Sequence, residues 1–319
     1  MMNLLSVSET AAMLRAANNI LIVTHIRPDG DTAGSGCALC LGLRALGKTA
    51  YIAENHASMQ RYTYLLQPYF PPADFTPDFI AAVDIASAGQ FPPGHEALAA
   101  RTDLAVDHHG TNSGYARCTL LQPEAAAAGE AIFDILQALG VELTPTIAEA
   151  LYTALATDSN CFRTAGTTGR TLQIAAQLHD VGFDVTALNR RLFETRSQAR
   201  LRLEAYLFGS MRFPRPGLCL MILPYDTIVS LGVTEDDMDK LSTLTTAPEG
   251  TQIGVLLRQL GDGRWKTSLR TGGVPHAGEI LHTLGGGGHA DAAGTVLSGS
   301  AEELAERVLA AVDNYVRKT

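Results

Sequence analysis

The 319-residue sequence contains no apolar run long enough to cross a membrane. A membrane-spanning helix needs about 20 consecutive apolar residues, and no stretch of this chain approaches that length. The opening residues, MMNLL, also lack the basic segment and the long apolar stretch of a secretion signal. We therefore expect a cytoplasmic protein that does not associate with membranes.

Cysteine is scarce, and its number is odd. The chain has five cysteines, which argues against a disulfide framework. Cys37 and Cys40 form a Cys-x-x-Cys motif, but no second pair stands at the spacing of a zinc ribbon. Two small buried residues one helical turn apart explain this pair better than a redox or zinc role does.

Basic residues are outnumbered. The chain has 24 Lys and Arg residues against 33 Asp and Glu residues, a net charge of −9. A surface that binds an extended duplex usually carries a basic excess. The charge therefore weighs against a protein that holds long nucleic acid by its backbone. It does not weigh against a small phosphorylated ligand held by metal ions.

The first informative stretch follows a short apolar run at residues 20–23, which predicts a buried strand because it is partly β-branched and ends abruptly in polar residues. His25, Asp29 and Asp31 come next, with a proline and a glycine between them that let the chain turn sharply. A helix is predicted at residues 33–46. The strand end offers half of a metal site; the alternative is a polar turn with a capping aspartate.

The same layout recurs further along the chain. Residues 79–84 and 103–109 are apolar runs that end in Asp84 and in Asp107-His108-His109, and a predicted helix at 146–156 leads to Asp158. Buried strands alternating with helices or loops are typical of a parallel α/β sheet. Such sheets place their sites at the carboxyl ends of the strands, so we expect these polar groups to meet at one edge.

A single aspartate usually caps a helix or a turn, and a single histidine is more often a satisfied polar residue than a ligand. The joint occurrence is more telling, because many carboxylates at one edge would resist ionising together and divalent cations are the simplest remedy. Imidazole and carboxylate ligands suit manganese or another borderline metal better than calcium. Two such metals about 3.5–4 Å apart are a known arrangement for hydrolysing phosphate esters.

Composition then changes, and we place a domain boundary near residues 190–213, a predicted helical connector. A new strand is predicted at 218–223, a hairpin at 251–260 and 264–270, and a terminal helix at 301–316. Four consecutive glycines, residues 285–288, precede His289. We expect this run to lie outside strand and helix interiors and to bring backbone amides close to an anion. Basic residues on the hairpin would add positive charge that helps to bind the same anion.

These stretches together resemble the DHH phosphoesterases. The similarity to the four family motifs lies, in order, in residues 23–31, 83–84, 107–109 with Asn112, and 157–158. Residues 285–289 and 292–294 resemble the signature of the DHH-associated C-terminal domain. The resemblance implies an α/β fold: a parallel-sheet DHH domain at 1–190, a helical linker at 191–213, and a smaller α/β substrate-binding domain at 214–319, with substrate in the cleft between the domains.

The resemblance also implies roles for single residues. One metal ion would be held by His25, Asp29 and Asp84. A second would be held by Asp31, Asp84, His108 and Asp158, so that Asp84 bridges the two ions. Asp107 and His109 would join Asp84 as catalytic residues, by supporting the ligands or contacting substrate. The expected substrate contacts are Asn112, Arg258, Lys266, Arg270, Gly286, Gly287, Gly288 and His289.

The compact two-domain layout resembles the NrnA-like group of this family. It implies a manganese-dependent phosphoesterase with two divalent ions, acting on short oligonucleotides, linear dinucleotides and 3′-phosphoadenosine 5′-phosphate. A soluble cyclic-dinucleotide phosphodiesterase and a non-catalytic nucleotide-binding regulator stay open as alternatives, and a homodimer is one option for its assembly. The motif around His289 argues against a family II pyrophosphatase. Asn160 stands where many relatives have glycine; asparagine tolerates left-handed backbone angles, so we expect the loop to survive.

Overall fold

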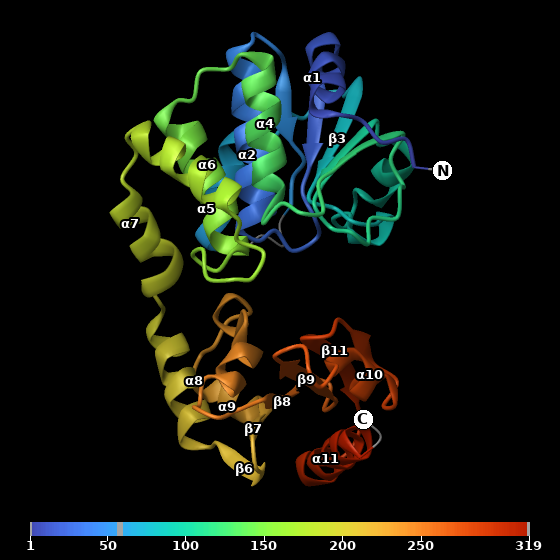
Figure 1. The fold of residues 1–319 in the computed structure, drawn as a ribbon, viewed down its shortest axis with the longest axis vertical. Helices are drawn as coiled ribbons and strands as arrows, with labels where there is room; N and C mark the ends of the chain where they lie inside the picture. Colours follow the sequence, from blue (N-terminus) through green and yellow to red (C-terminus); the bar gives the residue numbers. More distant parts are fainter. Residues whose placement is uncertain (1, 56–59, 318–319) are drawn as a thin grey trace. The chain divides into compact units, whose positions relative to one another are not determined.

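The computed structural model describes residues 2–55 and 60–317. The chain divides into two compact units, the first ending at Thr195 and the second beginning at Arg196 (Figure 1). The division falls inside the predicted linker. No helix among the described residues combines the length and the apolar character that a membrane span requires.

The first unit is built on a sheet of five parallel strands in the order β2-β1-β3-β4-β5. The strands are β1 (Ile20–Val23), β2 (Ala50–Ile52), β3 (Phe79–Val83), β4 (Leu104–Asp107) and β5 (Cys118–Leu121). The predicted parallel α/β sheet is therefore confirmed. The chain crosses from one side of the sheet to the other between β1 and β3, the position at which sheets of this order bind their ligands.

The helices of the first unit pack on this sheet or on one another. They are α1 (Val7–Ala16), α2 (Gly30–Ala45), α3 (Thr63–Leu66), α4 (Ala128–Leu139), α5 (Pro145–Asp158), α6 (Gly169–Asp180) and α7 (Val185–Asn189). Figure 1 shows α2, α4, α5 and α6 grouped together, and α2 packs most extensively against α5. Neither α1 nor β5 was expected from the sequence.

Two predicted helices differ from those observed. The residues from 124 to 139 also predict a helix, but the observed helix α4 begins only at Ala128, because Ala127 has an extended backbone with φ −160°. One or two charged helices are also predicted at residues 186–212, where the structure has α7 and α8 (Gln198–Gly209). A π-helical turn at Arg190–Glu194 separates them, and the Ser197 side chain caps α8.

The second unit is also α/β. Its six-stranded mixed sheet has the order β10-β11-β9-β8-β7-β6, in which only β7 and β8 are parallel. The strands are β6 (Arg212–Arg215), β7 (Leu218–Leu223), β8 (Ile253–Gln259), β9 (Trp265–Thr271), β10 (Gly287–Gly288) and β11 (Ala292–Leu297). Helices α10 (Ala277–His282) and α11 (Ala301–Val316) pack on one face, and α8 and α9 (Tyr225–Ser230) pack on the other.

The glycine run corrects one expectation. Gly287 and Gly288 form the short strand β10, opposite Gly294 and Ala293 of β11. A Cβ on Gly288 would lie 2.3 Å from the carbonyl oxygen of Ala292. Glycine is therefore needed there for two chains to approach closely, and pairing with β11 holds the flexible run in a strand.

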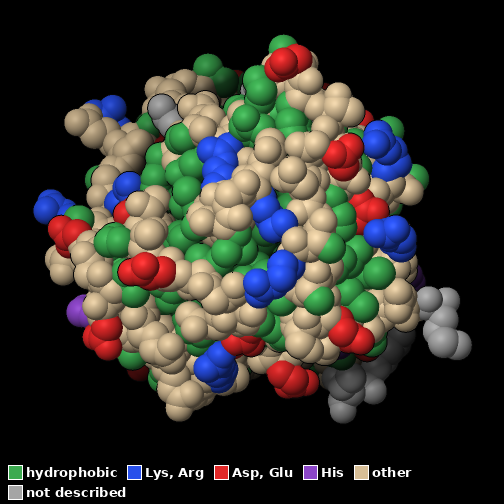
Figure 2. Space-filling model, turned by 90° about the horizontal axis from the view of Figure 1, so that it is seen from above, with side chains coloured by type: hydrophobic (Ala, Val, Ile, Leu, Met, Phe, Trp, Pro, Cys, Tyr) green, Lys and Arg blue, Asp and Glu red, His purple; other side chains and the backbone are tan. Residues whose placement is uncertain are grey.

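The surface carries both signs of charge. On the face shown in Figure 2, Lys and Arg side chains are interspersed with Asp and Glu side chains among hydrophobic and neutral ones. Several of the Lys and Arg side chains lie near the middle of that face, with Asp and Glu side chains mostly around them.

The close contact of α2 with α5 depends on glycine. A Cβ on Gly34 would lie 2.3 Å from the carbonyl oxygen of Ala150 and 2.9 Å from the amide nitrogen of Ala154. Both are backbone atoms of α5, which cannot move as a side chain can. The helices would have to separate, and overpacking of this kind typically costs about 1–3 kcal/mol.

We therefore predict that Gly34→Ala lowers the free energy of unfolding by about 1–3 kcal/mol, measured by urea denaturation. Gly169→Ala, at the first turn of α6, is the matched control, because no atom lies within 4 Å of the added methyl group. The control should be neutral or gain up to about 1 kcal/mol. Equal effects of the two substitutions would contradict the packing argument.

Candidate functional site

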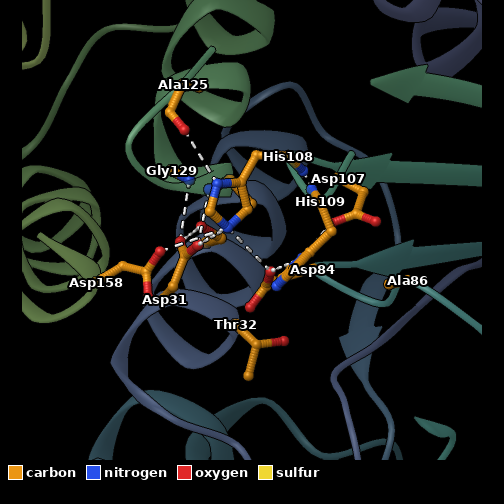
Figure 3. Close-up of polar contacts among 12 residues, drawn as sticks. Asp31, Thr32, Asp84, Ala86, Asp107, His108, His109, Ala125, Gly129 and Asp158 are labelled. Carbon is orange, nitrogen blue, oxygen red and sulfur yellow. Dashed lines mark hydrogen bonds and ion pairs between the residues drawn. The ribbon is translucent and has the colours of Figure 1, made fainter. Parts of the chain in front are cut away.

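Polar side chains gather where β1, β3 and β4 end, as Figure 3 shows for most of them. His25 follows β1, Asp84 follows β3, and His108 and His109 follow β4. The start of α2 contributes Asp29 and Asp31, and the last residue of α5 is Asp158. The structure thus brings together all the residues predicted as metal ligands, although they come from distant parts of the sequence.

The start of α2 shows that capping and metal-ligand geometry occur together. Asp29 is the N-cap, and its Oδ1 accepts hydrogen bonds from the amides of Asp31 at 3.0 Å and Thr32 at 3.3 Å. The same oxygen lies 3.6 Å from Nε2 of His25. The capping bonds hold Asp29 in place and direct Asp31 inward from the first turn of the helix.

Asp84 occupies the middle of the group. Its Oδ2 lies 3.7 Å from Nε2 of His25, and its Oδ1 lies 3.7 Å from Nε2 of His108 and 3.4 Å from Nδ1 of His109. The backbone at Asp84 is left-handed, with φ 58°, and its amide donates to the carbonyl of Val106. Oδ1 is buried and has no hydrogen-bond partner among the described residues.

His108 is oriented by the backbone. Its Nδ1 lies 3.0 Å from the carbonyl oxygen of Ala125. A carbonyl can only accept, so this contact places the proton on Nδ1 and leaves a lone pair on Nε2. Nε2 faces Oδ2 of Asp31 at 3.7 Å and Oδ2 of Asp158 at 3.4 Å. A histidine held in this way is ready to act as a metal ligand.

Asp31 is almost fully buried, with 1% of the residue exposed. Its carboxylate accepts hydrogen bonds from Ser35 Oγ at 2.9 Å and from the amides of Ala128 at 2.7 Å and Gly129 at 3.1 Å. Burial, followed by the negative charge of Asp158, nevertheless raises the pKa of Asp31 to about 7. These hydrogen bonds therefore only partly offset the loss of solvation.

Asp84 shows the same imbalance more strongly. Burial, followed by the negative charge of Asp31, raises the pKa of Asp84 well above its ordinary value. Neighbouring carboxylates that resist ionising together need positive charge close by to balance them. Oδ1 of Asp84 has no hydrogen-bond partner among the described residues, so positive charge would be best placed beside this oxygen. The residues therefore fit a bound cation.

Among the residues that the structure describes, three sets of side chains have ligand atoms within 4.8 Å of one another. The sets are His25-Asp29-Asp84, Asp31-His108-Asp158 and Asp84-His108-His109. Every residue predicted to bind metal belongs to at least one set, and Asp84 belongs to two of them. The side chains of this site could therefore hold a metal ion.

Asp107 supports His109. Its Oδ1 lies 2.8 Å from Nδ1 of His109, and its Oδ2 accepts from Asn112 Nδ2 at 2.6 Å. Burial would raise the pKa of Asp107, but the hydrogen bonds from His109 and Asn112 together lower it below its ordinary value. The hydrogen bond to Asp107 in turn raises the pKa of His109. The result is a half-exposed imidazole whose pKa is higher than that of a free histidine.

Asn112 is placed as a support for this pair. Its Nδ2 donates to Asp107 and to the carbonyl of Ile85 at 3.3 Å, and its Oδ1 accepts from the amide of Gly114 at 2.9 Å. Its side-chain hydrogen bonds are therefore made within the protein. A contact of Asn112 with substrate stays a prediction.

The basic residues predicted to bind substrate share one face of the second sheet. Arg258 on β8 lies directly opposite Lys266 on β9, and neighbours that alternate with them pack against α10 and α11. Arg270 lies further along β9, where its Nε donates to Ser242 Oγ at 3.1 Å. Arg258 Nη1 contacts Met238 Sδ at 2.9 Å. The exposed His289 follows β10 in the same unit.

The glycines of this motif have different surroundings. A Cβ on Gly286 would lie 2.7 Å from the carbonyl oxygen of Gly294, and Gly288 is equally restricted. Gly287 has open space where its Cβ would lie. Packing therefore explains two of the three glycines, whereas Gly287 leaves room for a ligand to approach the backbone.

Several supports of the site could not be predicted from side-chain patterns. Ser35 and the backbone groups of Ala125, Ala128 and Gly129 hold Asp31 and His108. Small apolar residues give no sequence signal for a carbonyl or amide that reaches a distant side chain. Only Ser35, one helical turn after Asp31, could have been found from its spacing.

Comparisons with known proteins agree with this arrangement. Residues 19–155 match the model of the DHH family, N-terminal domain, and residues 223–318 match the DHHA1 domain. The chain is 34% identical to the bifunctional oligoribonuclease and PAP phosphatase NrnA of Thermus thermophilus, covering 95% of this chain and 92% of that protein. It is 23% identical to the probable bifunctional oligoribonuclease and PAP phosphatase NrnA of Streptococcus mutans, covering 89% and 91%.

A solved structure has the same fold. The exopolyphosphatase-related protein from Bacteroides fragilis superimposes with a TM-score of 0.88, at 22% identity, over 97% of this chain and 96% of that one.

We predict that Asn112→Ala lowers the free energy of unfolding by about 1–3 kcal/mol, because it leaves a buried oxygen of Asp107 without its donor. Urea denaturation measures the change. The control is Asn3→Ala, an exposed asparagine whose Nδ2 contacts Cys118 Sγ at 3.3 Å; it should change stability by less than about 0.5 kcal/mol. A harmless Asn112→Ala would show that Asp107 does not depend on this amide.

Proposed function

The chain belongs to the DHH family of phosphoesterases and is a hydrolase; from this premise we propose that it cleaves short oligonucleotides, linear dinucleotides and 3′-phosphoadenosine 5′-phosphate with the help of manganese. The relatives named as oligoribonuclease and PAP phosphatase support these substrates. The observation that carries the proposal is the convergence of imidazoles and carboxylates on the buried, under-compensated Asp84.

We propose that two divalent ions occupy this site. His25, Asp29 and Asp84 would hold one, and the other would be held by Asp31, Asp84, His108 and Asp158. A mixed imidazole and carboxylate donor set favours manganese over calcium. When bound, the ions would lower the pKa of an attacking water and neutralise charge on the phosphoryl oxygens.

We assign proton transfer to His109. Asp107 accepts the hydrogen bond from Nδ1 of His109, so the proton that this imidazole can give away is on Nε2. The His109 side chain is 44% exposed and its pKa is raised, so a protonated ring is available to substrate. Protonation of the departing oxygen by Nε2 would complete the cleavage of the ester. Asp107 keeps the ring in that orientation.

We propose that the second unit binds the part of the substrate that does not react. Arg258, Lys266 and Arg270 on one sheet face could neutralise one or two phosphates, and His289 and Gly287 would add contacts near them. In this proposal residues 1–190 are catalytic, 191–213 are the linker, and 214–319 bind substrate. So few basic groups cannot hold a long strand.

The first prediction concerns the metal ions. Metal-free protein titrated with Mn²⁺ in a calorimeter should bind two ions per chain. Asp84→Asn should weaken both by at least about 100-fold, since loss of mere supporting groups already costs about 10–100-fold. Asp29→Asn should weaken one ion only. If Asp84→Asn and Asp29→Asn gave the same isotherm, Asp84 would not bridge the two ions.

The second prediction concerns substrate length. Turnover efficiency should be highest for roughly two to five nucleotides and should fall toward a 24-mer, with weak salt dependence, because affinity for long strands needs many phosphate contacts. A hydrolysis panel measures this with Mn²⁺, at low and high salt. It should also contain 3′-phosphoadenosine 5′-phosphate, a cyclic dinucleotide and pyrophosphate. Fastest cleavage of the longest strand, or of the cyclic dinucleotide, would contradict the proposed substrates.

A further inference from the structure

Glu130, in the first turn of α4, is a buried acidic residue outside the predicted site. Only 4% of the residue is exposed, and no cationic side chain in the described part of the chain forms an ion pair with it. Its Oε1 accepts hydrogen bonds from the amide of Ala126 at 3.1 Å and from Thr171 Oγ1 at 2.7 Å. Buried carboxylates without a cationic partner are rare, which indicates that Glu130 has a specific role at this position.

The segment that Glu130 holds, residues 125–129, supports two of the proposed metal ligands. The carbonyl of Ala125 lies against Nδ1 of His108, and the amides of Ala128 and Gly129 donate to Asp31. Figure 3 shows Ala125 and Gly129 beside these two ligands. The segment consists of four alanines and a glycine, so none of its own side chains can fix it by hydrogen bonding.

Glu130 provides that restraint from the end of the segment. Its side chain turns back to the amide of Ala126, which adjoins the carbonyl that orients His108. Thr171 fixes the carboxylate in turn, because its Oγ1 donates to Glu130 while accepting from the amide of Thr168 at 3.0 Å. Thr168 is the N-cap of α6. The restraint therefore extends to the beginning of that helix.

We propose that Glu130, fixed by Thr171, is a positioning residue for the metal ligands His108 and Asp31. By holding residues 125–129, it keeps the Ala125 carbonyl on Nδ1 of His108 and so keeps the lone pair on Nε2. It also keeps two amides on the Asp31 carboxylate. This inference rests on the proposed metal-binding function, but it assigns a role to a residue that never touches an ion.

Four variants separate the contributions. Glu130→Gln retains the Oε1 acceptor and should change Mn²⁺ affinity by less than about 3-fold, whereas Glu130→Ala leaves both donors unpaired and should weaken one of the two ions by about 10–100-fold. Thr171→Val keeps the shape but removes the hydroxyl donor, so it should weaken the same ion. Thr171→Ser restores the hydroxyl and should rescue affinity.

A second readout needs neither metal nor turnover. The ¹⁵N shifts of the imidazoles in metal-free protein report which ring nitrogen carries the proton, and the spectrum of His108→Asn assigns the signal of His108. The wild type and Glu130→Gln should show the proton on Nδ1. Glu130→Ala and Thr171→Val should show a mixture of tautomers, which a general loss of stability would not produce.

Glu204→Ala is the matched control. Glu204 of α8 is similarly buried and accepts from Arg200 Nε at 2.7 Å, in the second unit. Its loss should lower stability without changing Mn²⁺ affinity or the tautomer of His108.

The proposal is overturned if folded Glu130→Ala keeps both wild-type readouts, if Glu130→Gln is as damaging as Glu130→Ala, or if Glu204→Ala weakens Mn²⁺ equally. Should Glu130→Ala not fold, Thr171→Val decides by the same readouts. Failure of the proposed substrates would show only in the hydrolysis panel and would leave these readouts unchanged.

Discussion

The crowding of carboxylates at one edge of a parallel sheet is the constraint on which the rest of this structure depends. Asp31 and Asp84 are both buried and resist joint ionisation. Hydrogen-bond donors offset part of this negative charge. Two amides of helix α4 donate to Asp31, and the side chains of His109 and Asn112 hydrogen-bond to Asp107. Asp84 Oδ1 receives none from the part of the chain that the structure describes. The charge that remains uncompensated is therefore concentrated at one position, between the imidazoles.

Close helix packing makes that concentration possible. A Cβ added at Gly30 would lie 2.2 Å from Thr157 Oγ1, and a Cβ added at Gly129 would lie 2.7 Å from Ala154 Cβ. Without side chains at these positions, α2 and α4 both approach α5, so Asp31, the amides of α4 and Asp158 come within reach of His108. The glycines lower the helix propensity of α2 and α4. Larger residues at these positions would push the helices apart and so separate the proposed metal ligands.

The sequence predicts which side chains gather at the site better than it predicts what holds them there. Apolar runs ending in His25, Asp84 and Asp107 sufficed to predict parallel strands and a shared edge, because strand period and burial are strong local signals. The start of α4 was misplaced, since alanine is a good helix former, whereas Ala127 is extended here and Ala125 lies in a turn in which its amide donates to the Gln122 carbonyl. β10 was missed for a related reason: its glycines are compatible with a strand only when β11 lies beside them. Backbone groups that act over long distances leave no pattern in the residues that carry them.

Exposure to solvent differs among the side chains of the site. Asp31 and Asp84 side chains are 1% and 4% exposed, whereas those of Asp29, Asp158 and His109 are 43%, 36% and 44% exposed. The buried members are fixed by the sheet and α4, and the more exposed three form the solvent-accessible rim of the site.

Asp158 on that rim is followed by three consecutive left-handed residues, with φ 49° at Asn160, 59° at Cys161 and 62° at Phe162. Such a run is costly for residues with a Cβ. Two hydrogen bonds stabilise this run. The amide of Cys161 donates to the carbonyl of Ala156, and the amide of Phe162 donates to Ser159 Oγ at 2.9 Å. Asn160 adopts the left-handed angle expected of it. The strained turn thus ends α5 abruptly at Asp158, so the most exposed of the three side chains Asp31, His108 and Asp158 is held by backbone geometry in place of burial.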